Sequence, residues 1–98
     1  MFGLCVRFTC KDEVSAEAYD RLVAETIEAI KTKEPGTIVY ASHLVDGQPL
    51  QRIFYELYRD EDAFEVHKEN VNLKNLVAHL ADWVVGGKFE IMKLAPFA

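Results

Sequence analysis

In two neighbouring segments of this chain, apolar residues occupy both the odd-numbered and the even-numbered positions. This feature constrains the fold more than any other. Residues 37–45 and 50–58 are rich in β-branched and aromatic side chains, and Asp46-Gly47-Gln48-Pro49 between them has turn chemistry, so a hairpin is expected. A strand with one face in water alternates apolar and polar residues. Because neither face of this hairpin is polar, both faces should be covered. The alternating sets are Ile38, Tyr40 and Leu44 against Val39, Ala41 and Val45, and Ile53, Tyr55 and Leu57 against Phe54 and Tyr58.

The first third of the chain predicts a strand followed by a long helix. Apolar residues alternate from Phe2 to Cys10 with the period of two that is typical of a strand. Ser15 is the expected N-cap of a helix, because apolar residues from Tyr19 to Ile30 then recur at helical spacing. The helix is expected to end at Glu34-Pro35-Gly36, since proline disfavours helical geometry in the residue before it.

The last third predicts two helices and a closing strand. Asp60 is the expected cap of a short helix, which is followed by a break near residues 70–72. A further helix ends at Gly86-Gly87, and residues 88–94 alternate again as a strand. The apolar stripe of that further helix consists of Leu73, Leu76, Val77, Leu80, Ala81 and Val84, with Trp83 beside it.

This order of elements predicts an α+β fold of the ferredoxin-like kind, βαββααβ, as a single domain over residues 1–98. The four strands should form one antiparallel sheet with the helices on one face. Four strands at about 4.8 Å make a sheet roughly 19 Å wide, which two helices of about 10 Å cover once. Because the second face is also apolar, we expect a homodimer packed sheet to sheet.

Composition and charge exclude several classes of partner. The net charge is −5 and Lys and Arg are not clustered, which argues against nucleic acid. Cys5 and Cys10 fall on opposite faces of one predicted strand and cannot form a local disulfide, which favours a reducing compartment. No signal-peptide pattern and no apolar run of about 20 residues is present, so we expect a cytoplasmic protein without membrane attachment.

The sequence also lacks the motifs of several kinds of enzyme. It has no phosphate-binding loop, no G-x-S-x-G motif and no Cys/His spacing suited to zinc. We therefore expect no metal and no bound cofactor. An oxidation would then require a substrate that itself donates an electron to oxygen, as an ionised phenol or hydroquinone does.

Two motifs carry a family resemblance that extends over nearly the whole chain. EPGTIVY at residues 34–40 with His43, and FYELYRDEDAF at residues 54–64 with His67, resemble the antibiotic biosynthesis monooxygenase family, including its quinol monooxygenases. The resemblance implies a dimeric α/β barrel with a pocket in each subunit between helices and sheet. It also implies the absence of flavin, metal and haem. Relatives oxygenate anthrones, oxidise quinols, isomerise small metabolites or degrade haem.

The sequence departs from the family pattern at two places. Many relatives carry a second histidine five residues after the position of His67, where this chain has Asn72, so a paired-histidine mechanism is not supported. In the haem-degrading branch an asparagine, a tryptophan and a histidine shape the site. The corresponding positions here are Val6, His67 and Val77, which disfavours haem degradation.

His67 is the candidate general base, because an imidazole transfers protons near neutral pH and its spacing from Phe64 turns it inward. The alternative is a half-solvated histidine at a helix edge. Glu56, an acid within an apolar strand, is either a pocket group, an orienting group or an ion-pair partner in the dimer. Tyr40 is a candidate third catalytic residue. Candidate substrate-binding residues are Tyr55, His43, Tyr58, Phe64 and Trp83, although tyrosines in strands and a tryptophan beside an apolar stripe more often belong to a core.

The strand period does not allow all of these side chains to line one cavity. Tyr40 has the opposite parity from His43, and Tyr55 has the opposite parity from Glu56. If a four-residue turn pairs Val45 with Leu50, Tyr40 lies opposite Tyr55 and Glu56 lies opposite Val39. We expect the pair of tyrosines to face the helices.

The sequence supports three hypotheses for function. The first is a cofactor-independent monooxygenase that uses O2 on a phenolic, quinol or anthrone-like substrate. The second is a non-oxidative isomerase or lactone-processing enzyme on the same fold, for which identical acid and base groups would suffice. The third is a dimeric protein that binds a small ligand without catalysis. Oxygen consumption separates the first from the second, and the effect of removing His67 separates both from the third.

Overall fold

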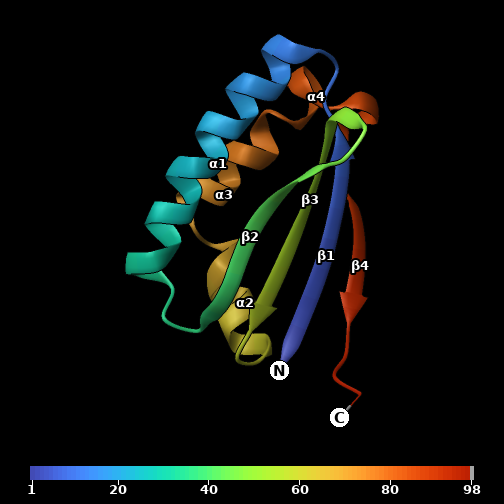
Figure 1. Cartoon of the computed structure of the whole chain (residues 1–98). Helices are drawn as coiled ribbons and strands as arrows, with labels where there is room; N and C mark the ends of the chain where they lie inside the picture. Colours follow the sequence, from blue (N-terminus) through green and yellow to red (C-terminus); the bar gives the residue numbers. More distant parts are fainter. Residues whose placement is uncertain (98) are drawn as a thin grey trace.

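The computed structural model describes residues 1–97, and it confirms the predicted fold class. Four strands form one sheet: β1 (Phe2–Thr9), β2 (Thr37–Val45), β3 (Gln48–Tyr58) and β4 (Glu90–Leu94). Their order across the sheet is β2-β3-β1-β4, and each neighbouring pair is antiparallel. Figure 1 shows this twisted sheet with β2 and β4 at its edges.

The helices lie on one side of the sheet (Figure 1). They are α1 (Glu13–Lys33), α2 (Glu61–Lys68), α3 (Val71–Ala78) and the single turn α4 (Leu80–Trp83), followed by a 3-10 turn, η1 (Val85–Gly87). Helix α1 packs beside α3, so these two helices form most of the layer. Within the described part of the chain, no helix has the length and apolar character needed to cross a membrane.

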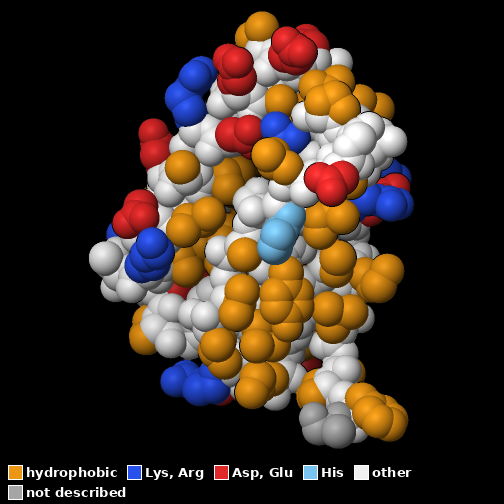
Figure 2. All heavy atoms as spheres, viewed as in Figure 1, with side chains coloured by type: hydrophobic (Ala, Val, Ile, Leu, Met, Phe, Trp, Pro, Cys, Tyr) orange, Lys and Arg blue, Asp and Glu red, His pale blue; other side chains and the backbone are white. Residues whose placement is uncertain are grey.

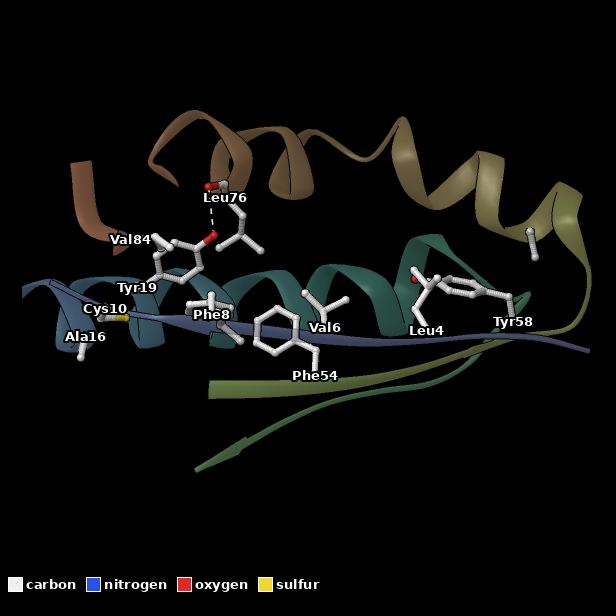
Figure 3. Close-up of a cluster of buried hydrophobic side chains, with 12 residues drawn as sticks. Leu4, Val6, Phe8, Cys10, Ala16, Tyr19, Phe54, Tyr58, Leu76 and Val84 are labelled. Atoms are coloured by element: carbon white, nitrogen blue, oxygen red, sulfur yellow. Dashed lines mark hydrogen bonds between the residues drawn. The ribbon is translucent and has the colours of Figure 1, made fainter. Parts of the chain in front are cut away.

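The core lies between the helices and the sheet. Leu4, Val6 and Phe8 alternate along β1 and are buried, and Figure 3 shows all three side chains directed at the helix layer. At one end of the core the Tyr19 hydroxyl of α1 donates a hydrogen bond of 3.1 Å to the backbone oxygen of Leu76 in α3. This bond satisfies a buried phenol and ties the two helices together.

The prediction that Ser15 caps α1 was wrong, because Asp12 takes that position. Asp12 has an extended backbone, and its carboxylate accepts the backbone N–H of Ser15 at 2.7 Å. A carboxylate at a helix N-terminus satisfies a free N–H and is favoured by the helix dipole. The helix therefore begins at Glu13, three residues before the predicted Ala16.

The prediction of a four-residue turn in the hairpin was also wrong. Val45 pairs with Gln48, so only Asp46 and Gly47 form the turn, and Gly47 has a φ of 75° that glycine adopts without strain. A register shift between Leu44 and Val45 follows. As a result Tyr40 lies opposite Glu56, not opposite Tyr55. The two tyrosines do not face the helices together, because Tyr55 is on the other face of the sheet.

The continuous last helix that the apolar stripe predicted is interrupted. It breaks at His79 between α3 and α4, and it ends at Trp83. Val84 has an extended backbone and forms a β-bridge with Cys10, while the Lys11 N–H donates to the Trp83 carbonyl at 2.9 Å. These contacts with the end of β1 compete with helical hydrogen bonds, and they explain the early end of the helix. Strand β4 starts at Glu90, two residues after the predicted Lys88.

The second face of the sheet carries apolar side chains, and no helix within residues 1–97 covers it. Figure 2 shows hydrophobic side chains gathered over the strands on this side of the molecule. Tyr55 is 39% exposed and Met92 is 63% exposed. By strand parity this open face, as we call it, carries the polar side chains of Arg7, His43 and Glu90 and the apolar side chains of Cys5, Val39, Ala41, Ile53, Tyr55, Leu57, Met92 and Leu94.

We predict that Leu76→Ala lowers the free energy of unfolding by about 2–5 kcal/mol, because it leaves a cavity in a closed core. Leu76 is 0% exposed. Leu44→Ala, the same chemical change at a side chain that is 76% exposed, should alter it by less than about 1 kcal/mol. Chemical denaturation monitored by circular dichroism measures both. Equal losses in the two variants would contradict the core described above.

Candidate functional site

An apolar cavity of about 180 Å³ lies between the helix layer and the sheet. Its apolar wall comes from β1, β3, β4, α2 and α3 and from the segment before β4. One end of the cavity is polar, and there Tyr40, Glu56 and His67 meet. Lys68 lines the cavity as well, with its ammonium 5.1 Å from the centre of the Phe64 ring. The apolar residues are Leu4, Val6, Phe54, Phe64, Leu73, Val77, Phe89 and Ile91.

His67 is the central polar group of this site and is 1% exposed. It lies in the last turn of α2, where Asp60 caps the helix by accepting the Ala63 N–H at 2.8 Å. Its Nδ1 is 2.9 Å from Oε1 of Glu34, and its Nε2 is 3.7 Å from Oε1 of Glu56. The imidazole is therefore placed between two buried carboxyl groups, one on each side.

Aromatic rings hold the imidazole in place. The ring of Tyr40 from β2 is centred 5.1 Å from that of His67, and the ring of Tyr58 from β3 is centred 5.3 Å from it. Phe64, one helical turn earlier, stacks on the same imidazole at 6.4 Å. Such packing restricts the ring to one orientation, as a catalytic group requires.

Glu34 is a site residue that the sequence analysis missed, because it was interpreted only as the end of a helix. It is the C-cap of α1 and is 3% exposed. Its carboxylate accepts hydrogen bonds from the Thr37 hydroxyl at 2.8 Å and from the Asn70 amide at 2.6 Å, besides contacting His67. An acid at a helix C-terminus opposes the helix dipole, and this unfavourable position is the signal that could have indicated a role.

Burial changes the proton affinities of these groups. It raises the pKa of Glu56 to about 7, and the charge of Glu34 acts in the same direction, while the hydrogen bond from Tyr58 acts against both. Burial lowers the pKa of His67, and the charge and hydrogen bond of Glu34 partly offset this. At neutral pH the imidazole is therefore uncharged and able to accept a proton.

The two tyrosines of the site keep their protons at neutral pH. Burial, followed by the charge of Glu56, raises the pKa of Tyr58 far above its ordinary value. Its hydroxyl donates a hydrogen bond of 2.5 Å to Oε1 of Glu56. Burial likewise raises the pKa of Tyr40 well above its ordinary value, with Glu56 as the next cause. Both phenols are therefore hydrogen-bond donors.

The structure brings together some of the residues selected from the sequence and separates others. His67, Glu56, Tyr40 and Phe64 line the cavity, and Tyr58 lies behind its wall, where it donates a hydrogen bond to Glu56. The other three lie elsewhere. Tyr55 and His43 are on the open face, where His43 Nδ1 is 3.2 Å from the Ile53 carbonyl oxygen. Trp83 stacks on His79 at 4.2 Å and packs against Tyr19 at 5.7 Å.

The chemical capacity of the site follows from this arrangement. The apolar wall suits an uncharged aromatic ring, and the polar end offers one neutral imidazole, one carboxyl group and the phenol of Tyr40 as a donor, while the phenol of Tyr58 donates to Glu56. Among residues 1–97 no group of three His, Cys, Asp or Glu side chains is arranged to hold a metal ion. The residues present can bind a ring and take a proton from a hydroxyl on it.

Comparisons with known proteins agree with this fold. Residues 1–79 match the model of the antibiotic biosynthesis monooxygenase family. Among curated proteins, none matches the chain in sequence.

Solved structures superpose over almost the whole chain. A protein from Bacteriodes thetaiotaomicron, provisionally named an antibiotic biosynthesis monooxygenase, superposes with a TM-score of 0.85 at 24% identity, over 99% of this chain and 90% of that one. A protein from Nitrosomonas europaea with the same provisional name gives 0.86 at 18% identity over 100% of both chains. Rv0793 from Mycobacterium tuberculosis gives 0.85 at 18% identity, over 99% of this chain and 95% of that one. At these identities the likeness concerns the fold.

The raised pKa of Glu56 predicts a specific pH dependence of stability. The ordinary pKa of the carboxyl group is 4.5, and in the folded protein it is about 7. At pH values between these two, the folded carboxyl keeps a proton that the unfolded carboxyl releases. Glu56 therefore lowers the free energy of unfolding as the pH rises through this range. Glu56→Gln removes this effect, so we expect the variant to gain up to about 3 kcal/mol relative to wild type between pH 4.5 and 7.

Urea denaturation at several pH values measures this difference. His67 changes the free energy of unfolding in the opposite direction, since its contribution is lost at low pH. This contribution is common to both proteins and cancels in their difference. Glu28→Gln on α1 serves as the control, since the side chain of Glu28 is 74% exposed and away from the sheet. A difference between Glu56→Gln and wild type that is constant with pH would contradict a carboxyl group that stays protonated in the fold.

Proposed function

Because this chain belongs to the antibiotic biosynthesis monooxygenase family, we propose that it is a cofactor-independent monooxygenase of a phenolic, quinol or anthrone-like aromatic compound. The single observation that carries the proposal is the position of His67, a buried neutral imidazole at the polar end of an apolar cavity. A ring in that cavity has its hydroxyl next to a base. Its remaining surface is in contact with apolar side chains.

In the proposed reaction, Nε2 of His67 takes the proton of the substrate hydroxyl, and the electron pair stays on the substrate oxygen. The resulting anion donates an electron to O2, and the two radicals combine into a carbon–oxygen bond. One oxygen atom remains in the product and the other leaves as water, with all four electrons taken from the substrate. The apolar wall keeps bulk water from the reactive intermediates.

Glu56 and Tyr40 are proposed to orient the substrate oxygen. The carboxyl group of Glu56 is 3.7 Å from Nε2 of His67, so one substrate oxygen can contact both groups. With a pKa of about 7, Glu56 can also return a proton to the oxygen that leaves. Tyr40 forms the adjacent wall and offers its hydroxyl as a donor.

We predict that wild-type protein consumes O2 with hydroquinone or anthrone and that His67→Ala lowers the rate by about 10²–10⁴-fold, as expected when a general base is lost. An oxygen electrode measures the rate, and mass spectrometry of products formed under ¹⁸O2 shows whether oxygen is incorporated. His79→Ala is the matched control, because the imidazole of His79 is 41% exposed and 3.3 Å from Asp82. It should retain the wild-type rate.

Three results would contradict the proposal. Turnover of a lactone without O2 would indicate the isomerase or lactone-processing reaction. Binding of the ring compounds without any turnover, with an affinity that His67→Ala leaves unchanged, would indicate a ligand-binding protein. Equal oxygen consumption by wild type and His67→Ala would show that this histidine is not the base.

We propose further that a second copy of the chain covers the open face. The open face is the surface of a single sheet, and its central side chains are apolar. Burying these side chains is favourable, and a partner with a similar flat apolar surface would do so. A face that packs on itself around a two-fold axis is the simplest such partner. Sheet-to-sheet packing would also close the barrel from the side opposite the helices.

We expect wild-type protein to be a dimer at micromolar concentration and Tyr55→Arg to be a monomer, because a charge at the centre of the interface would be buried without a partner. Sedimentation equilibrium measures both masses. Val14→Arg is the control, since Val14 is 77% exposed on α1, away from the sheet. A monomeric wild type, or a Tyr55→Arg variant that remains dimeric, would refute this arrangement.

A further inference from the structure

The hydrogen bonds around Glu34 fix which of its partners are donors. The Asn70 side chain is held at both ends, because its oxygen accepts the backbone N–H of Asn72 at 2.8 Å and its nitrogen donates to Oε2 of Glu34 at 2.6 Å. The amide cannot be reversed without losing the bond to Asn72. Oε2 of Glu34 is therefore an acceptor.

The other oxygen of Glu34 is also an acceptor. Oε1 accepts the Thr37 hydroxyl proton at 2.8 Å, and it lies 2.9 Å from Nδ1 of His67. With both oxygens accepting, the carboxylate carries no proton to donate, so the bond to the imidazole needs a proton on Nδ1. A neutral imidazole has only one ring proton. Nε2 of His67 is then left with its lone pair, and it points toward Glu56 and the cavity.

We propose that Glu34 is the positioning residue of this site, fixing His67 as the Nδ1–H tautomer so that the basic Nε2 faces the substrate cavity. The proposal rests on the function proposed above, in which Nε2 is the base. It adds that the negative charge of Glu34 stabilises the imidazolium formed when that base takes a proton. Glu34 acts through His67, since it does not line the cavity itself.

A second hollow of about 350 Å³ lies on the other side of Glu34. It is formed where the end of α1 meets the start of β2, and Ile30, Lys31, Thr37 and Ile38 contribute to its wall. Glu34 and Tyr40 line this hollow, and Tyr40 also lines the substrate cavity. A small molecule entering here would reach the position of the Glu34 carboxylate without passing through the substrate cavity.

Other charged groups near His67 do not replace Glu34 in this role. Glu56 of β3 lies on the Nε2 side and has a pKa raised to about 7, while Tyr58 and Tyr40 remain protonated. Lys68, next to His67 on α2, is at the cavity wall, where its ammonium is 2.8 Å from Glu65. Of these side chains, only Glu34 is in hydrogen-bond contact with Nδ1.

The state of the His67 ring is a direct test that needs no substrate. Nitrogen-15 NMR of the full chain at pH 7 should show a neutral His67 with its proton on Nδ1. In Glu34→Gln we expect the Nε2–H tautomer to become populated, because the new amide group can donate to Nδ1. The midpoint of the His67 titration should also fall by about one to three pH units with the loss of the charge. The control Glu28→Gln alters an exposed carboxylate of α1 that pairs with Lys31 at 3.1 Å, and it should change neither quantity.

A second variant tests the carboxylate group itself. Glu34→Ala should lose the tautomer preference, and sodium formate, entering through the second hollow, should restore it, whereas sodium chloride at equal ionic strength should not. Where wild type oxidises hydroquinone, formate should raise the rate of Glu34→Ala at least tenfold. If this variant does not fold, Glu34→Gln alone decides.

Two results would overturn the proposal: a wild-type His67 with its proton on Nε2, or the Nδ1–H tautomer unchanged in Glu34→Gln. The outcomes separate this inference from the proposed function. A wild type with the expected tautomer but no oxygen consumption refutes the function alone. An active wild type with the proton on Nε2 refutes the role of Glu34 alone.

Discussion

The hydrogen bond between Glu34 and His67 is the interaction on which the arrangement of the site depends. It joins the end of α1 to the end of α2 within an otherwise apolar layer, and both side chains are almost fully buried. A buried carboxylate without donors would cost several kcal/mol, so Thr37, His67 and Asn70 together make its position tolerable. Because three segments of the chain meet at this carboxylate, the fold and the orientation of the imidazole are set by the same contacts.

The polar end of the cavity combines two carboxyl groups in different states. Glu34 is surrounded by hydrogen-bond donors, whereas Glu56 receives one bond, from Tyr58, in a more apolar setting that raises its pKa to about 7. This difference in environment makes Glu34 a hydrogen-bond acceptor through both oxygens and leaves Glu56 able to exchange a proton near neutral pH. The imidazole lies between them, 2.9 Å from Glu34 and 3.7 Å from Glu56.

The sequence predicted the class of fold and the inward orientation of the His67 side chain, but not which residues of the sheet face that side chain. Strand and helix periodicity located every main element, because local alternation reports which side is buried. The hairpin register depends on the two-residue turn at Asp46 and Gly47 and on the register shift between Leu44 and Val45, and together they place Tyr40 opposite Glu56 and not opposite Tyr55. Glu34 was missed because its partners Thr37, His67 and Asn70 meet it only in the folded chain. The early end of the last helix likewise depends on a distant contact between Val84 and Cys10.

In the proposed complex an aromatic hydroxyl binds at the polar end of the cavity, against Nε2 of His67. A crystal structure of the protein with hydroquinone, prepared without oxygen, tests this most directly. We expect a ring enclosed by Phe54, Phe64 and Val77, with one hydroxyl oxygen within hydrogen-bond distance of Nε2. A ring bound on the open face of the sheet, or in the cavity with its hydroxyls turned away from His67, would contradict it.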